Sequence, residues 1–88
     1  MKQLKVEKVS AQELTHKHIG ERVQFYWKFP LSDVRAVITG DLREVHHDGE
    51  GTTVWLTGRN SEGSKQEFQI SPITRIGVVR EVNPFVHA

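Results

Sequence analysis

The sequence predicts a mainly β protein, a small five-stranded bent barrel with a short N-terminal α-helix. Two observations predict the barrel: short runs of alternating apolar and polar residues, and Gly, Pro or Asp residues between the runs. In the clearest run, residues 23–29, the alternation puts apolar and polar side chains on opposite faces of a strand. The apolar set is Val23, Phe25, Trp27 and Phe29.

We expect the barrel strands at residues 22–29, 34–46, 52–57, 65–70 and 75–79. The second run is long, and its apolar residues change parity between Leu42 and Val45. A bulge or sharp bend near Gly40 accounts for that change. The turns between strands are 30–33, 47–51 and 58–64, and a single helical turn at 71–74 precedes the last strand. The expected core is Val23, Phe25, Trp27, Phe29, Ile38, Leu42, Val54, Leu56, Phe68, Ile70 and Ile76.

A helix-start pattern precedes the first barrel strand. Ser10 and Glu13 have the spacing of a capping box, in which each side chain satisfies a backbone N–H of the other residue. This predicts a helix of two turns at residues 11–18. Because so short a helix is unstable alone, Leu14 and Ile19 are expected to pack on the barrel.

Length and composition indicate one soluble domain, residues 1–88, divided into an arm or strand (1–9), helix plus barrel (10–80) and tail (81–88). Charged residues make up 26% of the chain and the net charge is +1. The chain has no cysteine, its first residues do not read as a signal peptide, and no apolar run has membrane-spanning length. We therefore expect a cytoplasmic protein without a membrane partner.

Several short patterns resemble the SH3-like and Sm-like small β-barrels over residues 10–80. They are Ile19-Gly20-Glu21-Arg22-Val23, Gly40-Asp41-Leu42, Val54-Trp55-Leu56 and the Ile73/Ile76 pair. The resemblance implies the fold alone. Sm proteins bind RNA through a Met-Asn loop and an Arg-Gly pair, and the corresponding segments 46–51 and 71–74 contain neither. The 30–33 turn is likewise too short for the acidic loop of an SH3 peptide groove.

No residue pattern indicates catalysis, a cofactor or a metal. The five histidines include two close pairs, but His16 and His18 diverge on a helix, and His46 and His47 face opposite sides of a strand. His46 with Asp48 and one distant group is the best metal candidate, and zinc sites need three or four converging ligands. A polar, titratable turn explains these residues more simply.

Two aromatic side chains have outward parity, Tyr26 and Trp55. Outward aromatics anchor protein partners, stack on bases, or pack across neighbouring strands. We expect a non-catalytic binding module for a protein, including a second copy of the chain, with Trp55 and Tyr26 as anchors and Arg43 and Arg59 at the rim. An open strand edge offers a further route to self-association.

The alternative function is binding of RNA or single-stranded DNA. It uses the same aromatics together with basic residues of both chain ends, namely Lys2, Lys5, Lys8 and Arg75. The near-neutral charge and the missing Sm motifs favour the protein partner. Salt separates the two, because phosphate binding weakens steeply as salt rises.

Overall fold

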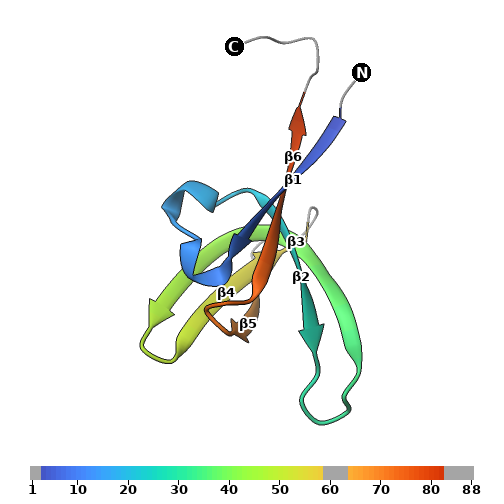
Figure 1. The fold of residues 1–88 in the computed structure, drawn as a ribbon, viewed down its shortest axis with the longest axis vertical. Helices are drawn as coiled ribbons and strands as arrows, with labels where there is room; N and C mark the ends of the chain where they lie inside the picture. Colours follow the sequence, from blue (N-terminus) through green and yellow to red (C-terminus); the bar gives the residue numbers. More distant parts are fainter. Residues whose placement is uncertain (1–2, 59–63, 83–88) are drawn as a thin grey trace.

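The computed structural model describes residues 3–58 and 64–82, which form one six-stranded antiparallel sheet (Figure 1). The strand order is β1-β6-β2-β3-β4-β5. The strands are β1 (Gln3–Ser10), β2 (Arg22–Lys28), β3 (Arg35–Asp48), β4 (Gly51–Thr57), β5 (Gln66–Ile70) and β6 (Arg75–Val82). The only helical elements in these ranges are two single 3-10 turns, η1 (Ala11–Glu13) and η2 (His16–His18), and none is long and apolar enough to cross a membrane.

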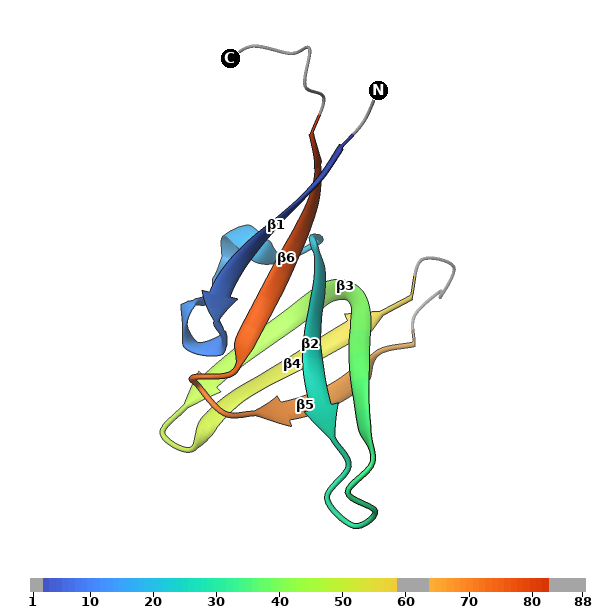
Figure 2. The same ribbon diagram turned by 45° about the vertical axis from the view of Figure 1, so that its right-hand side comes forward.

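The long strand β3 bends and belongs to both halves of the sheet. Residues 35–41 pair with β2, and residues 41–48 pair with β4. The register shifts between Leu42 and Glu44, which leaves Arg43 as an extra residue in a bulge. A Cβ atom on Gly40 would lie 3.0 Å from the Thr57 carbonyl oxygen, so glycine lets the strands approach closely there. The predicted bend near Gly40 is confirmed, and Figure 2 shows β3 as an arch joining the two halves.

The predicted five-stranded barrel is not confirmed, because the structure has six strands in one open sheet that ends in β1 and β5. The sixth strand is the N-terminal arm, which pairs with β6 from Gln3↔Val82 to Ser10↔Arg75. Pairing with this arm also extends β6 beyond the predicted end at residue 79. The remaining strands lie within two residues of their predicted bounds. The 71–74 segment is a turn closed by the Thr74 N–H and the Ser71 carbonyl oxygen (3.0 Å).

The predicted two-turn helix at residues 11–18 is wrong. The capping residues do meet, since one Glu13 carboxylate oxygen accepts from the Ser10 N–H (2.9 Å) and the Ser10 hydroxyl (2.6 Å). However, Leu14 adopts an extended conformation with ψ 129°, which ends the first turn. A second turn then starts after Thr15, whose hydroxyl accepts from the Lys17 N–H (3.3 Å).

Backbone hydrogen bonds hold both ends of this segment against the rest of the fold. The Ala11 and Gln12 N–H groups donate to carbonyl oxygens of the turn before β6, at 2.8 and 2.9 Å. Further along, the Gly20 N–H donates to the Leu42 carbonyl oxygen (2.7 Å), and the Leu42 N–H donates to Glu21 (2.9 Å). These bonds satisfy backbone groups that the two short turns leave free, and the segment lies at the side of the sheet (Figure 1).

The core lies between the two halves of the bent sheet. Its buried apolar residues are Ala11, Leu14, Val23, Phe25, Leu42, Val54, Leu56, Ile70, Ile76 and Val78, with Trp27, Ile38 and Phe68 partly buried against them. Most of the predicted core is confirmed, as is the packing of Leu14. Phe29 was predicted to lie in the core and Ile19 to pack on the barrel, and both predictions are wrong, because 43% of the Phe29 surface and 37% of the Ile19 surface are exposed. Ala11 and Val78 were missed.

We expect Phe25→Ala to lower the free energy of unfolding by about 3–5 kcal/mol. Phe25 is 3% exposed and its ring meets that of Phe68 edge to face at 5.5 Å. Phe29→Ala is the matched control and should cost clearly less, because this ring lies near the hairpin tip. Chemical denaturation measures both, and equal losses would contradict the assigned core.

The Glu13 carboxylate should give stability a defined pH dependence. The Ser10 hydroxyl and N–H that donate to it lower the pKa of Glu13 in the folded protein. Its contribution is therefore present above the ordinary glutamate pKa and is lost as the pH falls through the lowered folded value. An NMR titration should find this pKa below the usual glutamate range, and Ser10→Ala should raise it. An unchanged pKa in that variant would contradict the contact.

Candidate binding surface

The outer face of the β2–β3 hairpin carries the most exposed aromatic side chain among the described residues. Tyr26 lies directly opposite Val37, and both side chains point away from the core. Tyr26 is 81% exposed and Val37 is more than half exposed. Cross-strand packing therefore shields Tyr26 little, and its ring is free to contact another molecule.

The tip of the same hairpin is also apolar. Phe29, Leu31 and Val34 are exposed, Leu31 completely. Two hydrogen bonds set the shape of the tip: the Phe29 N–H donates to Val34 (2.8 Å) and the Asp33 N–H donates to Phe29 (3.0 Å). Asp33 has a φ of 60°, a left-handed conformation that aspartate tolerates. The tip is thus an ordered turn that presents apolar side chains to solvent.

Basic residues surround Tyr26 on this outer face. Directly paired residues share a face of the sheet, so Lys28 and Arg35 lie on the same face as Tyr26. Gln24, also on this face, pairs with Gly77 on β6, and Gly77 pairs with Lys8 on β1. Lys8 therefore lies on this face, as does Arg75, which is two residues from Gly77 on the same strand. Arg22 pairs with Asp41 (3.4 Å), and Lys28 pairs with Asp33 (2.7 Å). Arg35 is exposed and has no acidic partner among the residues the structure describes. We call this surface the basic face; it comprises Lys8, Arg22, Tyr26, Lys28, Arg35 and Arg75.

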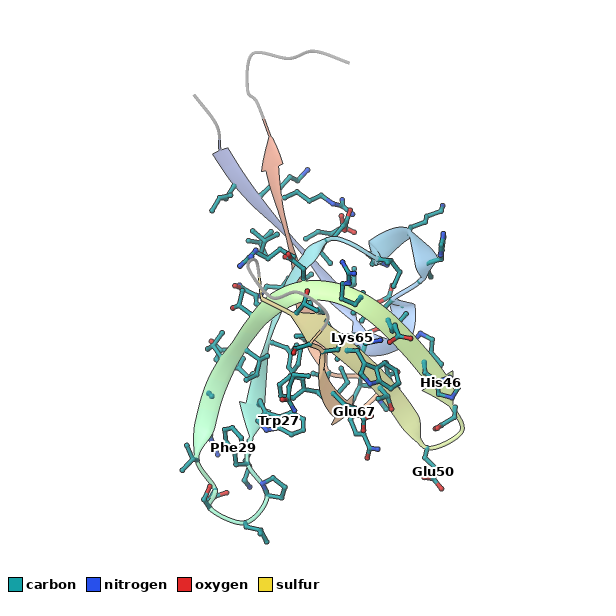
Figure 3. All side chains as sticks on the ribbon, turned by 180° about the vertical axis from the view of Figure 1, so that it is seen from behind. Trp27, Phe29, His46, Glu50, Lys65 and Glu67 are labelled. Carbon is teal, nitrogen blue, oxygen red and sulfur yellow. The ribbon has the colours of Figure 1, made fainter. Side chains whose placement is uncertain are left out.

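Trp55 lies on the outer face of the other half of the sheet. It is half-buried, between Glu44 on β3 and Glu67 on β5. Lys65 forms an ion pair with Glu44, and Figure 3 shows Lys65 and Glu67 on this side of the molecule. We call this surface the acidic face; it comprises Glu44, Trp55, Lys65 and Glu67, together with Asp48 at the end of β3 and Glu50 in the turn that follows.

The structure does not bring the two predicted anchors together within one chain. Tyr26 and Trp55 belong to different halves of the bent sheet, each on an outward side. Arg43 is exposed in the bulge of β3, whereas Arg59 lies outside the described residues.

The alternative set of basic residues is also divided. Lys8 and Arg75 lie on the basic face, Lys5 has the opposite parity on β1, and Lys2 lies outside the described residues. The sequence-based search missed Leu31 and Val34 of the hairpin tip. The signal available in the sequence was two apolar residues at a polar turn, Leu31 within the predicted 30–33 turn and Val34 directly after it.

The two neighbouring histidines differ in their surroundings. Both rings are exposed, but His47 forms hydrogen bonds to Leu14, directly after η1, and to Thr52 on β4. The His47 Nε2 donates to the Leu14 carbonyl oxygen (2.8 Å), which can only accept. In the neutral ring Nδ1 then accepts from the buried Thr52 hydroxyl (2.8 Å). His47 therefore joins the N-terminal segment to the sheet.

A shallow polar depression of about 300 Å³ lies beside the β3–β4 turn. Its lining residues are Asp48, Glu50, Gly51, Thr52, Thr53, Gln69, Ile70 and Ser71. Asp48 Oδ1 is already engaged, since it accepts from the N–H groups of Glu50 (2.8 Å) and Gly51 (3.0 Å). Within the described ranges, no three His, Asp or Glu side chains gather as a metal site would require. The Asp48 carboxylate therefore stabilises the β3–β4 turn.

Comparison of the chain with protein-family models, with curated proteins and with solved structures finds no match.

We expect His47→Ala to lower the free energy of unfolding by about 1–3 kcal/mol, because two buried polar groups lose their partner. His46→Ala is the matched control and should be nearly neutral, since that ring has no hydrogen bond to the described residues. Thermal denaturation at neutral pH measures both variants. Equal effects would show that His47 does not join the two elements.

Proposed function

We propose that this protein is a non-catalytic binding module that acts through protein–protein contact, with the β2–β3 hairpin as its contact surface. One observation carries the proposal. Of nine large hydrophobic side chains exposed in the described residues, five belong to this hairpin. They are Tyr26, Phe29, Leu31, Val34 and Val37.

Exposed apolar side chains gathered on one element are typical of interaction sites, whereas scattered ones need no explanation. Tyrosine is also enriched among the residues that dominate binding energy, because its ring buries a large area and its hydroxyl still forms a hydrogen bond. Strand pairing and the two hydrogen bonds of the tip fix the hairpin backbone, which reduces the entropy lost when a partner binds. These properties support the hairpin as the contact surface and Tyr26 as its anchor.

The bend of β3 near Gly40 and the short turn before β6 support the resemblance to SH3-like and Sm-like barrels. We propose that relationship for the fold only. The residues that bind RNA in Sm proteins are not carried over.

Binding of single-stranded nucleic acid is the second candidate. The specific observation in its favour is the position of Tyr26, an exposed ring beside Lys28 and Arg35. Aromatic stacking combined with phosphate contacts is how many proteins bind single strands. The apolar tip is not explained by this function, since Leu31 and Val34 offer nothing to a phosphate backbone.

Tyr26→Ala should weaken binding of a protein partner by about 2 kcal/mol while leaving the unfolding transition almost unchanged. Capture from extracts of the native host should retain partners on the wild-type protein and lose them on this variant. Ile73→Ala is the matched control, because Ile73 is exposed but lies outside the hairpin. It should retain the same partners as the wild type.

A titration with a single-stranded oligonucleotide tests the second candidate. If nucleic acid is the partner, affinity falls steeply as salt rises and is reduced by Tyr26→Ala. Identical capture by the wild type and by Tyr26→Ala, with no oligonucleotide binding, would contradict both functions.

A further inference from the structure

We infer that the partner of the basic face is the acidic face of a second copy of this chain, so that copies associate head to tail. This inference rests on the proposed function and specifies its partner. The starting observation is the separation of charge between the two halves of the sheet. A net charge of +1 for the whole chain conceals it.

The basic face has an excess of positive charge. Among its five basic residues, Arg22 and Lys28 are paired with Asp41 and Asp33. Arg35, beside Tyr26 and Val37, is exposed and unpaired in the described structure. The surface thus combines an apolar centre with a free guanidinium group, which calls for an apolar and acidic counterpart.

The acidic face has the complementary composition. Glu44 and Glu67 flank the half-buried Trp55 on its two neighbouring strands. Lys65 is paired with Glu44, and Glu67 is exposed without a basic partner in the ranges described. An aromatic ring beside a free carboxylate is suited to a guanidinium group and a tyrosine ring.

The shape of the sheet decides the kind of assembly. Both faces point outward from the core, on different halves of the bent sheet, so one chain cannot bring them together. Two copies can. When the basic face of one copy contacts the acidic face of another, the pair still has one free basic face and one free acidic face. Further copies can therefore add, and the rotation between neighbouring copies decides whether they form a closed ring or an open filament. Tyr26 and Trp55 then meet in one interface, each from a different copy.

Sedimentation velocity over a range of protein concentrations tests the inference, with the purified chain itself as the probe. The wild type should associate, more weakly at high salt. Arg35→Glu and Glu67→Lys each reverse a charge on one face and should each weaken association at least tenfold. Both residues are exposed, so thermal midpoints should stay close to that of the wild type and show that the variants fold. An equimolar mixture of the two variants should associate again, because each supplies the face that the other lacks.

Three outcomes would overturn the inference. A wild type that stays monomeric at high concentration and low salt excludes a second copy as the partner. Glu67→Lys that associates like the wild type shows that the acidic face takes no part. A mixture of folded variants that remains monomeric contradicts contact between unlike faces. Failure of the proposed function gives a different result: the wild type and Tyr26→Ala would then capture the same proteins from extracts of the native host.

Discussion

The bend in β3 is the constraint on which the rest of the structure depends. One strand pairs with β2 before the bend and with β4 after it, and the core fills the space between. The bend needs an extra residue at Arg43 and the absence of a side chain at Gly40. Backbone hydrogen bonds to Leu42, Pro72 and Thr74 hold the N-terminal segment against this core. Because the sheet folds on itself, its two outer faces are separate surfaces.

Alternation of apolar residues was sufficient to predict the strands and most of the core. Side-chain parity on a strand follows directly from sequence, so Val23 and Phe25 face inward as expected. The parity change between Leu42 and Val45 also predicted the irregularity in β3 correctly. Phe29 has the same inward parity but follows the end of β2, where the hairpin extends beyond the core.

Prediction from sequence failed where distant segments decide the local structure. Ser10 and Glu13 have a genuine capping contact, yet Leu14 is buried in the core in an extended conformation, and the turn ends there. The arm at residues 3–10 becomes a sixth strand because β6 offers it an edge. The anchors Tyr26 and Trp55 have outward parity as predicted, but parity does not say that their surfaces lie on different halves of the sheet.

An NMR dilution series on the isotopically labelled wild type most directly tests the central claim that the bent sheet presents two complementary faces. Amide shifts should change with concentration in two regions, around Tyr26 and Arg35 on the hairpin and around Trp55 and Glu67 on the opposite half. Buried β6 residues such as Ile76 should change little. Shifts confined to one region, or absent over the whole series, would contradict the account.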